Sequence, residues 1–145
     1  MNERIVNRKA GYEYEILEKF QAGVVLTGTE VKSVRAGQVN MGDAYCLIKD
    51  SKVIIRNLHI SVWKQGSYNN HQPLRDRILL LNSNEIRKIE TKLKDKGITM
   101  VPLEIFFSET GFVKILIGLA RGKKNYDKRE SIKEREVKRD LDRNL

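Results

Sequence analysis

The residues best suited to chemistry in this chain are two histidines, one cysteine and scattered acids. His59 falls in an expected strand and His71 in an expected loop, with no His-x-x-x-His pair and no second cysteine to complete a metal site. We interpret both histidines as satisfied or solvent-facing. Cys46 lies in the apolar stretch AYCLI, and we expect it to pack in the core of a protein from a reducing compartment.

Catalytic constellations are not evident either. Glu30, Asp43 and Asp50 could in principle assemble a metal-dependent nuclease site, but isolated acids are mostly surface charge and their spacing does not indicate a metal. The chain also lacks a G-x-x-x-x-G-K-[ST] phosphate loop. We therefore expect no catalytic residue, no metal and no cofactor, and a protein that is not an enzyme.

The stretch RGKKNYDKR has the residue types of a nucleic-acid contact. Gly122 permits close backbone approach, Lys123 and Lys124 supply charge for phosphates together with Arg121, and Tyr126 offers a flat ring for base stacking. The alternative is a solvated basic tail without a specific partner, which charge runs often are.

A second stretch, GTEVKSVRAG, places Lys32 and Arg35 three residues apart, where both can face one phosphate backbone. Glu30 beside them can accept hydrogen bonds from a base or a 2′-hydroxyl. The alternative, an ordinary surface salt bridge from Glu30 to Lys32 or Arg35, is equally compatible with the spacing.

Net charge favours a polyanionic partner. The 145 residues contain 28 Lys and Arg against 19 Asp and Glu, a formal charge of +9, which attracts nucleic acid through counterion release. A membrane surface would also attract this charge, but no apolar run approaches the roughly 20 residues needed to span a bilayer. The N-terminal stretch MNERIVNRKAG has no apolar signal core. We expect a cytoplasmic protein without membrane contact.

The elements that position these residues are mostly strands. Residues 12–26 carry Tyr12, Tyr14 and Ile16 at period two and predict one long strand or two short ones. GTEVKSVRAG then predicts a helix of about two turns, with Thr29 as its cap and Gly37 as its stop.

Further strands are expected along the rest of the chain. Residues 44–48 and 52–63 predict a hairpin around the turn KDSK, and a polar loop follows at 64–73. RILLL predicts another strand, Asn82 and Glu85 form a capping-box pattern that starts a second helix, and Gly97 closes that helix. Residues 98–107 and 112–120 predict a last hairpin.

These elements predict a mainly β fold. About six strands with two short helices fit an antiparallel barrel better than βαβ units, because helices are too few to cross over parallel strands. We place this domain at residues 1–120. Residues 121–145 contain ten Lys or Arg and six Asp or Glu with few apolar side chains, so we expect a basic tail that is disordered when free and helical on a partner.

GTEVKSVRAG, LHISVWKQGSYNNHQPLRDRILLLNSNEI and RGKKNYDKRESIKERE together resemble the SmpB family of bacterial SsrA-binding proteins, in order and over nearly the whole chain. The resemblance implies an oligonucleotide-binding-type (OB-type) barrel with two or three short helices. It implies an adaptor that binds the tRNA-like domain of tmRNA and delivers it to stalled ribosomes for trans-translation. It implies a tail that enters the empty message channel and folds there into a helix.

The family's functional positions carry over to particular residues. Those implied to bind RNA are Glu30, Lys32, Arg35, Leu81, Asn82, Lys123 and Lys124. In the tail, Tyr126 matches an aromatic expected to stack in the decoding centre, and Asp127, Lys128 and Arg129 match a motif required for rescue after the RNA is captured. We expect the protein to be monomeric when free.

Three places depart from the family pattern. Arg121 stands where Lys is common, Val62 and Trp63 where Pro-Tyr is common, and Ile78 where a basic residue often precedes the leucines. We carry over no contact at Val62, Trp63 or Ile78. The composition also suits a general basic nucleic-acid binder or a ribosomal protein, which would show no RNA preference in competition.

Overall fold

The computed structural model describes residues 4–66 and 69–123. Within these ranges the chain forms nine strands and three helices. The strands are β1 (Ile5–Val6), β2 (Tyr14–Val24), β3 (Val39–Asn40), β4 (Tyr45–Lys49), β5 (Lys52–Arg56), β6 (His59–Ile60), β7 (Arg77–Leu80), β8 (Ile98–Phe107) and β9 (Val113–Gly122). The helices are α1 (Arg8–Glu13), α2 (Gly28–Arg35) and α3 (Ser83–Leu93). No helix in the described part of the chain is long and apolar enough to cross a membrane.

Six strands close into an antiparallel barrel in the order β8-β4-β5-β7-β2-β9, because β9 pairs with β2 on one side and with β8 on the other. The contact between β4 and β8 is a single pair, Cys46 opposite Met100. β1 adds to the edge of β8, and β3 pairs with β6 in a separate two-stranded sheet. The expected mainly β barrel of about six strands is confirmed. The described residues form three further strands, β1, β3 and β6, and each is only two residues long.

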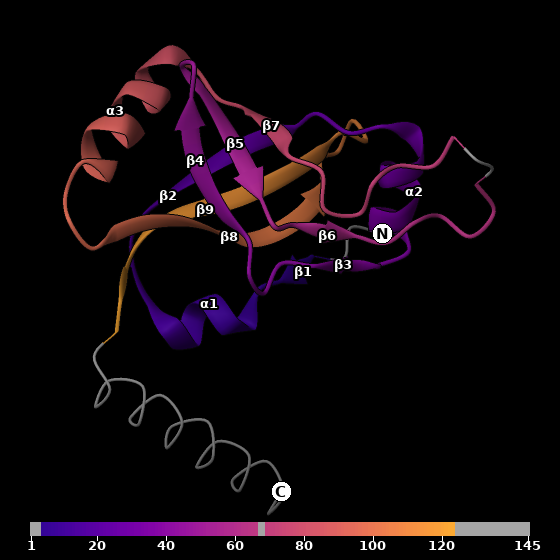
Figure 1. Ribbon diagram of the computed structural model, residues 1–145, viewed down its shortest axis with the longest axis horizontal. Helices are drawn as coiled ribbons and strands as arrows, with labels where there is room; N and C mark the ends of the chain where they lie inside the picture. Colours follow the sequence, from indigo (N-terminus) through magenta and orange to yellow (C-terminus); the bar gives the residue numbers. More distant parts are fainter. Residues whose placement is uncertain (1–3, 67–68, 124–145) are drawn as a thin grey trace, which may run out of the picture.

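Figure 1 shows the three helices on different sides of the barrel, with α3 at the upper left, α1 below and α2 at the right. α3 packs Ile86, Ile89 and Leu93 against the core, and Ile89 is fully buried. This is the apolar face expected from a period of 3.6 residues. Cys46 is buried, as expected, and burial raises the pKa of its thiol.

The first long strand starts later than expected, because Tyr12 belongs to α1. Asn7 caps this helix by accepting a hydrogen bond from the backbone N–H of Ala10 (3.3 Å), and Ala10 is buried. The prediction of a strand from residue 12 was therefore wrong. The alternation of Tyr12, Tyr14 and Ile16 crosses the boundary between α1 and β2.

The first expected hairpin is confirmed in β4 and β5. Its central turn residues, Asp50 and Ser51, both have positive φ (52° and 61°), as a two-residue hairpin loop of type I′ requires. The second strand is shorter than expected. Asn57 also has positive φ (62°), so β5 ends at Arg56, and only His59–Ile60 continues as β6.

The last expected hairpin is also confirmed, in β8 and β9. Both long partners of β9 have a register shift, between Ile16 and Glu18 in β2 and between Pro102 and Glu104 in β8. Gly118 lies between the two irregularities, and a Cβ there would be 3.0 Å from the side chains of Ile16 and Leu103. A side chain at position 118 would therefore crowd these two side chains, which favours glycine there.

Candidate nucleic-acid interface

Helix α2 is fixed at both ends by local hydrogen bonds. Thr27 is the N-cap: its hydroxyl accepts from the N–H of Glu30 (3.5 Å), and the Glu30 carboxylate accepts from the N–H of Thr27 (2.9 Å). Gly37 follows the helix with φ +75° and ends it, as expected. The prediction that Thr29 is the cap was wrong, because the reciprocal pair is formed two residues earlier.

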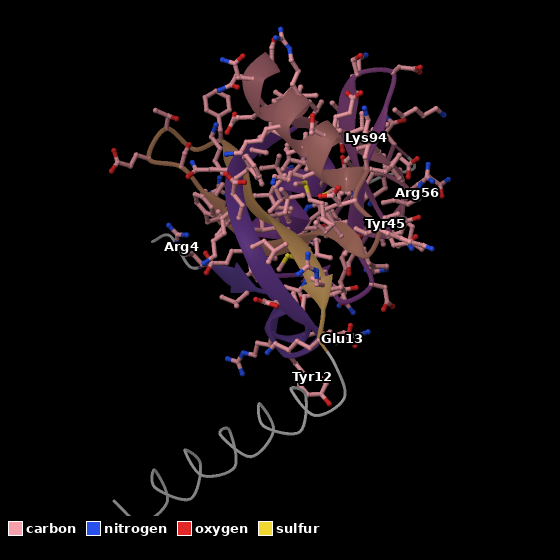
Figure 2. The ribbon with its side chains drawn as sticks, turned by 90° about the vertical axis from the view of Figure 1, so that its left-hand side faces the viewer. Arg4, Tyr12, Glu13, Tyr45, Arg56 and Lys94 are labelled. Carbon is pink, nitrogen blue, oxygen red and sulfur yellow. The ribbon has the colours of Figure 1, made fainter. Side chains whose placement is uncertain are left out.

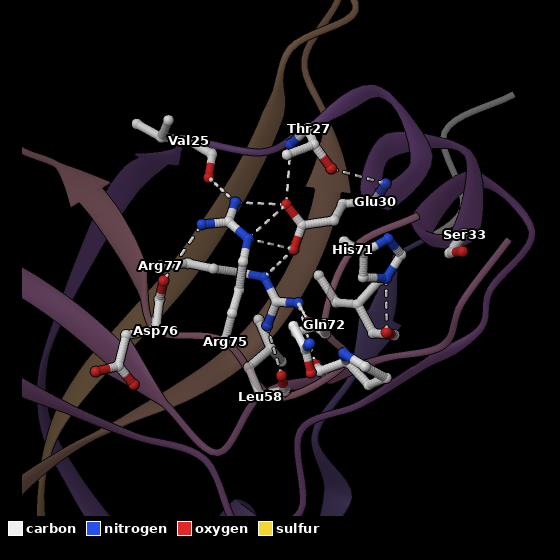
Figure 3. Close-up of polar contacts among 12 residues, drawn as sticks. Val25, Thr27, Glu30, Ser33, Leu58, His71, Gln72, Arg75, Asp76 and Arg77 are labelled. Carbon is white, nitrogen blue, oxygen red and sulfur yellow. Dashed lines mark hydrogen bonds and ion pairs between the residues drawn. The ribbon is translucent and has the colours of Figure 1, made fainter. Parts of the chain in front are cut away.

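Glu30 lies at the centre of a buried charged network, which Figure 3 shows. Its carboxylate accepts from Arg75, whose Nε is 3.1 Å from both oxygens, and forms an ion pair with Arg77. The two guanidinium groups also donate to backbone carbonyls, Arg75 to Val25 (3.2 Å) and Arg77 to Leu58 (2.6 Å). Glu30 and Arg77 are both 0% exposed. The alternative of a surface pair between Glu30 and Lys32 or Arg35 is therefore wrong.

Within this network, Glu30 and Arg77 keep their charges although both are buried. Burial alone raises the pKa of the Glu30 carboxyl, but hydrogen bonds from Arg75, from the Thr27 backbone and from Arg77 outweigh it and lower that pKa. Burial lowers the pKa of Arg77, and Glu30 opposes that effect. A paired charge of this kind is costly to leave without its partner.

Two more side chains attach the inner face of α2 to β6 and the loop after it. The Thr29 hydroxyl is 2.9 Å from Nδ1 of His71, and Nε2 of His71 is 2.8 Å from the carbonyl of Ile60. Since a carbonyl only accepts, Nε2 of His71 carries a proton and donates to Ile60. Ser33 donates to the carbonyl of Ser61 (2.6 Å). The interpretation of His71 as a satisfied histidine is confirmed; His59 is partly exposed in β6.

Lys32 and Arg35 lie on the opposite, solvent-exposed face of α2. Among the residues that the structure describes, neither has a carboxylate within ion-pair distance. The guanidinium of Arg35 stacks over the ring of Phe107, with Cζ 4.6 Å from the ring centroid. The helix thus presents two uncompensated positive charges on a rigid support.

Leu81 and Asn82 lie at the other end of β7, where α3 begins. Asn82 is the N-cap of α3: its side chain accepts from the N–H of Glu85 (2.8 Å), and Glu85 accepts from the N–H of Asn82 (3.2 Å). The expected capping box is confirmed. Leu81 packs against the core, partly buried. β7 runs from Arg77 in the Glu30 network to this point, so it connects the two expected positions without bringing them together.

Lys123 continues directly from β9. Its N–H donates to the carbonyl of Glu13 (2.9 Å), and its ammonium donates to the carbonyl of Gly11 (3.0 Å). These bonds attach the end of the barrel to α1, and Figure 2 shows Glu13 at the lower end of the barrel where β9 ends. The other expected tail residues lie outside the described part of the chain: Lys124, Tyr126, Asp127, Lys128 and Arg129.

The three acids considered for a nuclease site are dispersed. Glu30 is in the arginine network, Asp43 pairs with Lys9 (3.0 Å), and Asp50 is in the turn between β4 and β5. Within residues 4–66 and 69–123 no group of three His, Cys, Asp or Glu side chains could hold a metal ion.

Sequence reasoning missed Arg75 and Arg77, although one signal was available. In β7 the side chains alternate, and Arg77 is in phase with the buried Leu79, while Ile78 and Leu80 are exposed. A charged residue on the inward face of a strand must have a partner. The partner, Glu30, is 47 residues away, and the distance hides the pairing from local pattern analysis.

Comparison with known proteins gives concordant results. The family model described as "SmpB protein" matches residues 4–145. An SsrA-binding protein of Bacteroides thetaiotaomicron is 47% identical over 139 residues, covering 96% of this chain and 93% of the relative. One of Syntrophobacter fumaroxidans is 50% identical over 137 residues, covering 94% and 84%.

A solved structure described as "tmRNA-SmpB: a journey to the center of the bacterial ribosome" contains a similar chain. It superposes with a TM-score of 0.73 at 44% identity, over 89% of this chain and 94% of that one. The sequence and structure comparisons thus point to the same group of proteins.

Proposed function

Because the chain belongs to the SmpB protein family, we propose that it binds the tRNA-like domain of tmRNA and delivers it to stalled ribosomes for trans-translation. It works as an RNA-binding adaptor in the cytoplasm, monomeric when free, and catalyses no reaction of its own. Names of relatives that refer to SsrA binding, and a similar chain in a tmRNA-SmpB structure, support this proposal.

The observation that carries the proposal is the solvent face of α2. Lys32 and Arg35 present unpaired charge from a helix that is fixed at its cap and at its inner face. Cations on a fixed helix neutralise phosphates at a reduced ordering cost, because the backbone is already ordered and only the side chains lose freedom. We propose that both residues contact the RNA backbone.

Glu30 has a different role in this proposal. Its carboxylate is fully buried, so we replace the expected RNA contact with an indirect one. The ion pairs to Arg75 and Arg77 hold α2 against β7, and α2 in turn carries Lys32 and Arg35. Glu30 is therefore a positioning residue for the RNA-binding face.

The remaining sites stay proposals. Leu81, Asn82, Lys123 and Lys124 would extend the RNA contact; because Oδ1 of Asn82 is used by its helix cap, its amide nitrogen is the group available to RNA. We propose residues 1–120 as the RNA-binding domain and 121–145 as the ribosomal tail. In that tail Tyr126, Asp127, Lys128 and Arg129 would act in the decoding centre.

A binding assay and a tagging assay with the full chain test this division. The protein should bind the tRNA-like domain in a gel shift in the presence of excess competitor tRNA. Deletion of residues 126–145 should leave that binding intact but abolish tagging of stalled nascent chains. Equal binding to competitor tRNA would indicate a general basic binder, and loss of binding on deletion would contradict the assignment of RNA capture to the barrel.

Variants then test the site. Lys32→Ala and Arg35→Ala should each weaken binding, because each removes a phosphate contact. Lys92→Ala, an exposed lysine on α3, serves as the matched control and should bind as the unchanged protein does. Equal effects of all three variants would contradict a site on α2.

A further inference from the structure

We propose that Trp63, Lys32 and Arg35 form a binding site for one unpaired nucleobase of the RNA. The three side chains and Ala36 line an open, apolar pocket of about 330 Å³ between α2 and the loop that follows β6. That volume is at the small end of ligand pockets. The proposal rests on the proposed RNA-binding function and assigns one contact within it.

The residue types around this pocket match a base with its phosphate. Bases stack on the flat faces of aromatic side chains and of arginine guanidinium groups. Trp63 is partly exposed and offers an indole. The Arg35 guanidinium lies over the ring of Phe107, while Arg35 as a whole stays exposed. Lys32 adds a second positive charge for the phosphate.

Trp63 is held in place by its own backbone. The side chain of Asn70 accepts from the N–H of Trp63 (3.2 Å) and donates to its carbonyl (2.7 Å), and the N–H of Gly66 donates to the same carbonyl (2.8 Å). A Cβ at Gly66 would lie 2.5 Å from Nδ2 of Asn70, so this turn needs a glycine. The indole is thus presented by a pinned turn, which reduces the entropy lost on binding.

The two walls of the pocket are also fixed relative to each other. The hydroxyl of Ser33 donates to the carbonyl of Ser61 (2.6 Å), and the N–H of Ser61 donates to the carbonyl of Gln38 (3.1 Å). These bonds join α2 and the segment after it to the strand end that leads into Trp63. The pocket is therefore preformed in the protein without RNA, and Figure 1 shows the loop after β6 beside α2.

Fluorescence gives a direct test, because Trp63 is the only tryptophan of the chain. A base stacked on the indole quenches its emission, so titration of the full-length protein with the tRNA-like domain should quench the signal at the same RNA concentrations that saturate a gel shift. Saturated binding with unchanged emission would contradict the stacking site and leave the proposed function intact.

Variants separate stacking from charge. Trp63→Ala should weaken binding by roughly 5- to 150-fold, equivalent to about 1–3 kcal/mol for one stacked base. Trp63→Phe, which keeps a ring, should retain most of the affinity. Val62→Ala removes an exposed apolar neighbour and is the matched control, with no expected loss.

Salt dependence provides the second readout. Trp63→Ala should leave the slope of log Kobs against log salt unchanged, whereas Lys32→Ala should reduce it by about one. Trp63→Ala that binds as tightly as Val62→Ala would overturn the proposal. If the unchanged protein binds the tRNA-like domain no better than tRNA, the proposed function fails. The base-binding site is then tested separately, by measuring fluorescence quenching and the effect of Trp63→Ala with a single-stranded RNA.

Discussion

Glu30 shows how one buried charge can control an exposed binding face. Its two oxygens accept from Arg75, Arg77 and the N–H of Thr27, so a single carboxylate joins the start of α2 to β7. Lys32 and Arg35 follow it on the same helix and point to solvent. The residue that fixes the geometry of the interface is thus separate from those that would contact RNA.

Removing the Glu30 carboxylate should destabilise the protein strongly. Glu30→Ala leaves Arg77 buried without its partner, and breaking one side of a buried pair costs about 3–5 kcal/mol. Glu18→Ala is the control, because it breaks a partly exposed pair with Lys88 that contributes about 0–1 kcal/mol. Urea unfolding of both variants gives the comparison. Similar unfolding midpoints would contradict the structural role of the network.

The pH dependence of stability should also contain a Glu30 contribution. The pKa of Glu30 is lowered in the folded state relative to its ordinary value of 4.5. A lowered folded-state pKa contributes stability above the unfolded value, and that stability is lost as pH falls through the folded pKa. Wild type should therefore lose more free energy of unfolding than Glu30→Gln between pH 6 and acidic pH, when both are titrated with urea. Parallel curves for the two proteins would rule this out.

At the scale of elements, local sequence patterns found the strands and helices whose causes are local. The hairpin of β8 and β9, the capping box at Asn82 and the stop at Gly37 each depend on neighbours within a few residues. Patterns failed where local signals overlap. Tyr12 continues the alternation of β2 although it belongs to α1, and Asn57 interrupts the strand expected at residues 52–63 through its positive φ.

The candidate site, like the secondary structure, was predicted from the sequence only where its causes are local. Spacing alone placed Lys32 and Arg35 on one exposed helix face. Spacing could not predict the partners of Glu30 or the position of Trp63 beside Lys32 and Arg35. Both depend on contacts between residues that are 28 or more positions apart in the sequence. Long-range pairing is decided by the closure of the barrel, which a local pattern does not encode.

A single substitution in the turn between β4 and β5 should stabilise the protein. Ser51 has φ 61°, and a non-glycine residue in this region is strained by about 1 kcal/mol or more. Ser51→Gly relieves that strain in a two-residue loop that favours glycine, so we expect a gain of about 0.5–1 kcal/mol in free energy of unfolding. Ser83→Gly, in the first turn of α3, should instead destabilise. Thermal unfolding measures both changes, and a lower melting temperature for Ser51→Gly would contradict the assignment of the turn.

At the scale of the whole molecule, most of the net positive charge lies before residue 126. Residues 126–145 contain seven Lys or Arg and six Asp or Glu, a net charge of +1, which leaves +8 of the total +9 on residues 1–125. Within the tail of residues 121–145, whose net charge is +4, Arg121, Lys123 and Lys124 therefore supply all but one of the net charges. Long-range attraction to RNA should originate in the barrel and the first residues after it.

This distribution predicts how salt affects the deletion variant. Binding to the tRNA-like domain depends on salt through the phosphates that Lys and Arg neutralise, with a slope of about −0.9 per contact for duplex regions. Deletion of residues 126–145 should therefore leave the slope of log Kobs against log salt almost unchanged, whereas the double variant Lys32→Ala, Arg35→Ala should reduce it by about two. Gel shifts over a range of salt concentrations measure both slopes. A slope that falls by several units on deletion would mean that tail cations contact the tRNA-like domain directly, and the separation of RNA capture from the tail would then be wrong.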